Sequence, residues 1–295
     1  MPRLIALVFS ALLLVPTLAS AQPGAAPAPR TPSGDEALVT ITLRDGQLLR
    51  GVIVVETEHH LIIHLVSGGE MAVQQSQIRS IKRNDETVFV SADLEIYKHD
   101  PNRTRYLYGP SAFMLRQGEG YFSQTELIAS TIGYGVTDWL NIQVGSIVPA
   151  LLADGENFIV GARIGTPLSE NVHIAAGFHS LVIPDAGALG IASGQVTFGT
   201  PRAHLTLSAG YPFLLDEQGD DEVGEMLVSV SGNVRVSKHV ALITENWMLP
   251  DENNTVIGSL ATRFMGEHSA VDVGFLFIED AEIPIPWLDF TWNWD

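Results

Sequence analysis

Polar and apolar residues alternate along most of the second two-thirds of the chain. Leu140, Ile142 and Val144, for example, alternate with Asn141 and Gln143. A period of two with one apolar face is typical of β-strands that keep one face away from water. The pattern predicts an all-β, antiparallel fold with twelve strands, near residues 104–112, 126–136, 139–149, 157–166, 171–181, 189–199, 203–211, 225–236, 239–249, 255–264, 269–278 and 286–294.

The connections between these expected strands alternate in length. The short ones are residues 137–138, 167–170, 200–202, 237–238 and 266–268. The longer ones are residues 114–120, 150–156, 184–188, 212–224, 250–254 and 279–285. Outer-membrane β-barrels have short turns on one rim and longer loops on the other. An even number of strands also returns both ends of the barrel to one rim.

Aromatic residues fall near the ends of the expected strands. Near the short-turn rim are Tyr106, Tyr134, Phe198, Phe264, Trp292 and Trp294. Near the long-loop rim are Phe158, Phe178, Tyr211, Trp247, Phe277 and Trp287. Two such belts are typical of the interfaces on either side of a membrane.

The C-terminal segment adds a point of resemblance. Phe290, Trp292 and Trp294 alternate with Thr291 and Asn293, as in the terminal strand of outer-membrane proteins that assembly machinery recognises. The usual pattern ends on the aromatic residue, whereas this sequence continues to Asp295. Residues 104–295 thus resemble bacterial outer-membrane β-barrels as a class, which implies contact with outer-membrane lipid and with the barrel assembly machinery.

Composition agrees with a barrel that has an apolar exterior. Hydrophobic residues make up 46% of the chain and charged residues 17%, against roughly 25% charged residues in soluble domains. The chain has no Cys, so it offers no lipid-modified cysteine, disulfide or thiolate metal site. The formal net charge of −18 argues against a nucleic-acid partner, because phosphate binding needs Lys and Arg.

The chain begins with features of a secretory signal peptide. Arg3 is followed by an apolar run and then by the small residues Ala19, Ser20 and Ala21. We expect cleavage after residue 21, because the run is shorter than the roughly 20 residues of a membrane-spanning helix. Residues 22–36 are rich in Pro and Ala and predict an extended linker.

Residues 37–90 predict a small β module. Val39, Ile41 and Leu43 alternate with polar residues, and Asp45-Gly46 is a hairpin signal. The run 41–46 and Gly51 resemble SH3-like or Sm-like barrels. Sm-like proteins often bind RNA, but acidic residues outnumber basic ones here and a signal peptide precedes the module. We therefore expect a periplasmic module that contacts a protein or the cell wall, joined to the barrel by a connector at 91–103.

If the apolar faces of the strands contact lipid, the opposite faces define a lumen. The residues expected there are Arg105, Arg163, Arg235, Arg263, Glu245, Asp272, Asp289, His173 and His179. A twelve-strand barrel is intermediate in width between small filled barrels and wide porins. These charges could therefore line a narrow pore. Alternatively, they could neutralise one another in a filled interior. The size of the barrel slightly favours the filled interior.

The expected outer loop 212–224 is rich in carboxylates. They are Asp216, Glu217, Asp220, Asp221 and Glu222. Clustered oxygens can bind Ca²⁺, but the spacing does not match an EF-hand, so a solvated loop is the simpler interpretation.

Two histidine-containing groups are further candidates for chemistry. His179 and Ser180 are neighbours on one strand and point to opposite faces, so they cannot act together as base and nucleophile. His60 and His64 lie roughly 13 Å apart along a strand, too far to share one metal ion. We therefore expect no catalytic residue, cofactor or metal.

The sequence as a whole predicts an outer-membrane β-barrel that is not an enzyme. Two roles stay open, a passive narrow channel for small solutes and a membrane anchor for the periplasmic module. The rival interpretations are a soluble secreted all-β binding protein and a membrane-embedded lipid hydrolase. Extraction without detergent would favour the first rival, and loss of activity on replacing His179 or Ser180 would favour the second.

Overall fold

The computed structural model describes residues 34–90, 96–97, 100–152, 155–216, 221–249, 255–278, 281 and 283–294. The expected signal peptide and most of the expected linker lie outside this range. In the described residues, no helix has the length and apolar character needed to cross a membrane.

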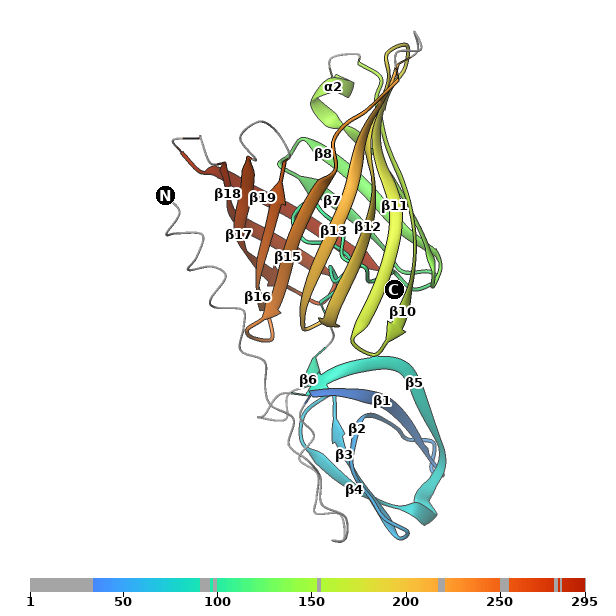
Figure 1. Cartoon of the computed structure of the whole chain (residues 1–295). Helices are drawn as coiled ribbons and strands as arrows, with labels where there is room; N and C mark the ends of the chain where they lie inside the picture. The colour runs from blue at the N-terminus through green and yellow to red at the C-terminus, as the bar shows by residue number, and fades with distance from the viewer. Residues whose placement is uncertain are drawn as a thin grey trace.

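The N-terminal part of the chain forms an antiparallel sheet in the order β4-β3-β2-β1-β5-β6 (Figure 1). Its strands are β1 (Gly34–Leu43), β2 (Leu48–Glu56), β3 (His60–Leu65), β4 (Glu70–Gln74), β5 (Ile78–Val90) and β6 (Ile96–Tyr97), with a 3-10 turn η1 (Gln75–Gln77) before β5. The strands expected from the sequence are all present. β1 also includes the last three residues of the expected linker.

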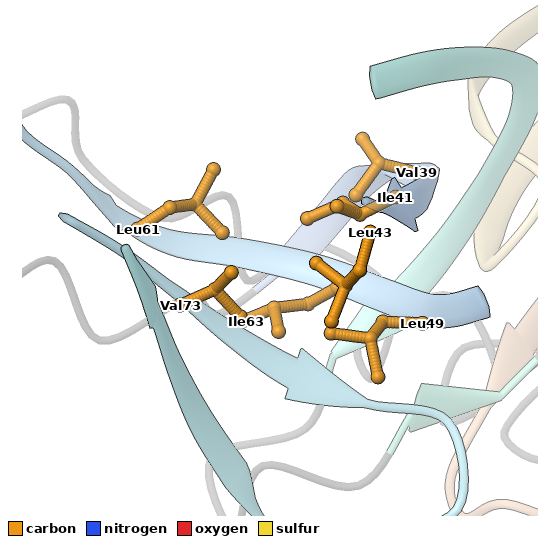
Figure 2. Close-up of a cluster of buried hydrophobic side chains, with 7 residues drawn as sticks. All are labelled: Val39, Ile41, Leu43, Leu49, Leu61, Ile63 and Val73. Atoms are coloured by element: carbon orange, nitrogen blue, oxygen red, sulfur yellow. The ribbon is translucent and has the colours of Figure 1, made fainter. Parts of the chain in front are cut away.

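Alternation along these strands builds the core of the sheet. Figure 2 shows apolar side chains from four strands pointing toward one another, namely Val39, Ile41, Leu43, Leu49, Leu61, Ile63 and Val73. The Asp45-Gly46 turn forms as expected, with Gly46 at a φ of +90°. Gly51 marks a close approach of two strands, because a Cβ there would lie 2.0 Å from the carbonyl oxygen of His64. Similarity of this sheet to SH3-like barrels stays a prediction.

The C-terminal part of the chain is a closed antiparallel β-barrel of twelve strands. The strands are β7 (Gly120–Thr125), β8 (Ala129–Thr137), β9 (Leu140–Ile147), β10 (Phe158–Ser169), β11 (Val172–Ile183), β12 (Gly187–Thr200), β13 (Ala203–Leu215), β15 (Leu227–Arg235), β16 (Val240–Met248), β17 (Val256–Met265), β18 (Ser269–Ile278) and β19 (Ile285–Trp294). Pairing of β19 with β7 closes the ring. A short helix α2 (Val148–Leu152) and a two-residue strand β14 (Glu222–Val223) lie in the long connections.

The fold class and the strand number are confirmed, but the first expected strand is wrong. Residues 104–112 are not a strand of the barrel, and β7 at Gly120–Thr125 takes that place in the ring. Gly109-Pro110 explains the error, because Pro cannot donate to a sheet ladder and Gly weakens a strand. Tyr106 N instead donates to Gly109 O at 2.9 Å, which folds the segment back on itself.

The barrel has an apolar exterior and a polar interior. On β19, Leu288, Phe290 and Trp292 are exposed, whereas Asp289 and Thr291 between them are fully buried. The same alternation runs around the ring, and most of the expected aromatic belt residues are exposed. Tyr106, Trp247 and Trp287 were wrongly assigned to the belts, because Tyr106 and Trp287 are buried and Trp247 bonds to the buried Glu245.

The two sides of the barrel differ in height. The strands β10 to β13 have 12 to 14 residues, whereas β15 to β19 have 9 or 10. In Figure 1, β11, β12 and β13 rise above the rest of the wall at the end away from the N-terminal sheet. The N-terminal sheet lies at the opposite end, beneath the short turns.

Candidate functional site

The chain segment before β7, residues 100–117, runs through the interior of the barrel, and we refer to it as the plug. Its residues form hydrogen bonds with side chains of β7, β10, β12, β13, β15, β16, β17 and β19. A segment of this length can reach eight strands around a closed ring only from inside the ring. Figure 1 shows this part of the chain within the barrel. The lumen is therefore occupied by the chain itself.

Arg263 of β17 is the best-connected charge at the plug. It has no exposed surface. Its guanidinium donates to both carboxylate oxygens of Asp272 at 2.8 Å and to Asp100 of the plug at 2.9 Å. It also donates to the backbone carbonyls of Asn102 and Tyr106, each at 3.1 Å. A buried cation needs such partners, because its removal from water is costly.

Asp100 is the first plug residue held by the barrel wall. Its carboxylate accepts bonds from Arg263 and from the amide of Asn233 at 3.3 Å. Burial alone would raise the pKa of Asp100, but Arg263 and the backbone amide of Asn102 together hold the pKa below its usual value. The carboxylate thus has a cation and two amides as partners inside the barrel.

A second ion pair joins the plug to β19. Arg105 of the plug donates to the carboxylate of Asp289, to Ser123 at 2.7 Å and to Thr291 at 2.8 Å. The same carboxylate accepts a bond from Thr125 at 2.6 Å. This places Arg105 opposite Asp289 in the interior, although Arg105 comes from the plug and not from a strand.

Glu245 of β16 binds the backbone of the plug. Its carboxylate accepts bonds from three consecutive amides, those of Leu107, Tyr108 and Gly109, at 2.9 to 3.0 Å. Trp247 also donates to it from its indole nitrogen at 2.6 Å. Hydrogen bonds to a charged acceptor are stronger than those between neutral groups. Glu245 thereby fixes the turn at the tip of the plug.

Arg163 of β10 holds the plug from the opposite wall. It donates to the carbonyl oxygens of Thr104, Ser111 and Phe113 at 2.9 to 3.3 Å. Glu245 and Arg163 therefore satisfy complementary sets of plug backbone groups, amides on one side and carbonyls on the other. Buried backbone groups need such partners.

Three histidines of the interior contact aromatic rings of the plug. The ring of Phe113 lies 4.5 Å from that of His173 and 5.0 Å from that of His204, measured between centroids. Tyr108 lies 6.0 Å from His179 in an edge-on arrangement. These contacts place His179 on the interior face. The neighbouring Ser180 donates instead to Leu189 O at 3.1 Å, in line with the opposite orientation of the two residues.

Arg235 and the acidic loop have hydrogen bonds of their own. Arg235 donates to the carbonyl oxygens of Ser237 and Lys238, in the turn after β15. In the acidic loop, Asp221 accepts a bond from the backbone amide of Asp216 at 3.1 Å, and Glu222 belongs to β14. Glu217 and Asp220 lie outside the described residues. No group of three or more metal-binding side chains occurs in the described part of the chain.

The sequence pattern revealed the charged wall residues but not the plug. It missed Asp100, and it missed Thr197 and Thr206, which bond to plug atoms at 2.7 and 2.6 Å. A Thr on a strand is too common to be singled out. The Gly109-Pro110 pair was the available signal, because such a pair marks a turn.

Comparison with known proteins identifies no family for this chain. No family model and no curated protein matches it. Among solved structures, the KdgM porin is similar at 5% identity with a TM-score of 0.39, over 59% of this chain and 95% of that chain. The NanC porin is similar at 7% identity with a TM-score of 0.38, over 59% of this chain and 97% of that chain. A loop-deletion mutant of OmpT from Vibrio cholerae is similar at 13% identity with a TM-score of 0.35, over 88% of this chain and 97% of that chain. At such identities and TM-scores, these likenesses carry no functional conclusion.

Proposed function

We propose that this protein is an outer-membrane β-barrel that is closed at rest by its own plug and holds the N-terminal sheet at the periplasmic rim. The membrane location is supported by the apolar exterior of the barrel. Side chains such as Val144, Leu207 and Phe275 are about half exposed on the strands, whereas Arg263, Asp272 and Asp289 are buried within. A barrel in lipid has its apolar surface outside.

The closed state is supported by the presence of the plug inside the barrel. Plug residues Tyr106, Ser111 and Ala112 are each at most 1% exposed. The plug bonds to eight strands of the ring. Arg163, Arg263 and Glu245 of the wall each bond to plug atoms. Of the two roles left open by the sequence, these contacts favour the anchor over an open channel.

Support for the periplasmic position of the sheet comes from the connections. The sheet lies at the short-turn end of the barrel (Figure 1), and short turns face the periplasm in outer-membrane barrels. The twelve strands also return the C-terminal strand to this rim. The sheet is therefore in position to contact a periplasmic protein or the cell wall.

Protease accessibility in cells tests this function. We expect external protease to leave the N-terminal sheet intact in whole cells and to degrade it only after the outer membrane is made permeable. The barrel should stay in the membrane fraction in both cases. Degradation of the sheet in intact cells would contradict the proposed orientation, and recovery in the soluble periplasmic fraction would contradict the membrane location.

A further inference from the structure

The plug is the only covalent connection between the N-terminal sheet and the barrel, and its first anchor lies close to the sheet. β6 ends at Tyr97, and Asp100 already bonds to Arg263 and Asn233 inside the barrel. Three residue steps span at most about 11 Å. The sheet therefore cannot move farther than this from the Asp100 anchor without pulling on it.

The plug is bonded to the wall without being part of the wall. The strands of the ring pair with one another through β7 and β19, and the one β-bridge described in the plug, Arg105 with Pro110, is internal to it. Wall side chains such as Glu245 and Arg163 bond to backbone amides and carbonyls of the plug. Tyr106 and Leu107 of the plug also pack against apolar residues of the wall. Water can replace the hydrogen bonds, and none of these contacts is a strand pairing of the ring. Withdrawal of the plug therefore leaves every strand pairing of the barrel intact.

The C-terminal end of the plug has the geometry of a pivot. Gly118 has a φ of +93°, a conformation that Gly adopts without strain. The backbone of Gly118 and Glu119 bonds to Gly135 of β8 at 3.0 and 2.9 Å. These two bonds attach the chain to the wall just before β7, so residues 100–117 can leave the lumen while residues 118–119 stay in place.

We propose that the plug is removable and that tension on the N-terminal sheet converts the barrel into a conduit for small polar solutes. This proposal rests on the membrane location proposed above. Without the plug, the interior retains hydroxyl and amide side chains such as Thr197, Thr206 and Asn233. The charged wall residues described above comprise three cations, Arg163, Arg235 and Arg263, and three anions, Glu245, Asp272 and Asp289. We therefore expect weak selectivity between anions and cations.

An engineered disulfide between plug and wall tests whether the plug is the gate. The chain has no Cys, so Ala112→Cys with Thr197→Cys adds one pair, at positions where Ala112 N lies 2.7 Å from Thr197 Oγ1. The full-length variant is inserted into a planar bilayer while urea is raised on the side of the N-terminal sheet. Under reducing conditions, discrete conductance steps should appear at urea concentrations that leave the barrel folded by heat-modifiable gel migration.

Oxidation should abolish these steps, and a reductant should restore them. Ala112→Cys alone is the matched control and should conduct in urea under both conditions. The proposal is overturned if the oxidised double variant conducts like the reduced one, or if the wild-type protein stays silent until the barrel itself unfolds. Failure to insert in a membrane at all would instead overturn the proposed location.

A pulling experiment tests the connection to the sheet. The N-terminus of the wild-type protein is attached to a force probe on the periplasmic side of a bilayer, and conductance is recorded during extension. Insertion of 20 Gly and Ser residues after Tyr97 should delay opening by roughly 70 Å of extension. Opening at the same extension in both proteins, or no opening before the barrel is extracted, would show that the sheet does not control the plug.

Discussion

Charged side chains of the wall hold the plug through its backbone as well as through its side chains. Glu245 accepts three plug amides, Arg163 donates to three plug carbonyls, and Arg263 bonds to both a plug carboxylate and plug carbonyls. Backbone recognition depends on the path of the plug more than on its sequence. Substitutions on the wall should therefore affect the plug more than most substitutions within it.

Glu245→Gln removes the charge from the acceptor of three amides. Charge-assisted hydrogen bonds each contribute roughly 1.5–3 kcal/mol, and an amide oxygen keeps part of this interaction. We expect the free energy of unfolding, measured by urea titration in lipid vesicles, to fall by about 2 kcal/mol. Glu225→Gln is the matched control, because Glu225 is exposed, and it should change this free energy by less than about 0.5 kcal/mol. Equal effects of the two substitutions would contradict the role of Glu245.

Arg263→Gln leaves Asp100 and Asp272 buried without a cation. Breaking a buried ion pair costs roughly 3–5 kcal/mol, so we expect the largest loss of stability among the wall substitutions. Asp272→Asn in the same chain removes one unpaired carboxylate and should recover part of the loss. The double variant is thus expected to unfold at a higher urea concentration than Arg263→Gln alone. A lower unfolding concentration for the double variant would contradict the pairing of Arg263 with Asp272.

The strands themselves could be predicted well from the sequence, because alternation in one strand is a local property. Eleven of the twelve expected segments overlap strands of the ring. Residues 104–112 contain Tyr106, Leu107 and Tyr108, which suit a strand, and their position in the lumen depends on contacts with distant residues such as Asp289 and Thr206.

The candidate site could be predicted only in part for the same reason. Inward-facing positions on each strand follow from alternation, which is why Arg163, Arg263 and Glu245 could be singled out. Their partners lie on the plug, which has no periodic pattern of its own. Trp287 shows the limit of the belt argument, because an aromatic residue at a strand end can equally pack inward, here against Tyr106 and Leu107.

One substitution at the level of a strand distinguishes a membrane barrel from a soluble one. Leu207 lies near the middle of β13 and is 45% exposed. In lipid, Leu207→Arg should lower the free energy of unfolding by about 2–4 kcal/mol, because a charge then faces the bilayer interior. Leu48→Arg on the N-terminal sheet, where Leu48 is 66% exposed, should have little effect. A soluble protein would tolerate both substitutions alike.

The whole molecule combines a rigid ring with a segment that runs through it. The ring is held by continuous strand pairing, whereas the plug is held by separate polar contacts and by the packing of Tyr106 and Leu107 against the wall. This difference predicts two transitions for the wild-type protein in urea, with loss of the plug before loss of the barrel. In the variant Ala112→Cys, fluorescence of a probe attached to the new thiol should respond at lower urea than the heat-modifiable band. Coincident transitions would show that the plug and the barrel unfold as one unit.

We propose that residues 120–294 form a closed barrel in the outer membrane. Heat-modifiable gel migration of protein extracted from cell envelopes distinguishes such a barrel from a soluble protein. We expect that extraction requires detergent and that the unboiled protein migrates as a compact band apart from the boiled one. Recovery of the protein in the soluble periplasmic fraction, with the same migration before and after boiling, would contradict it.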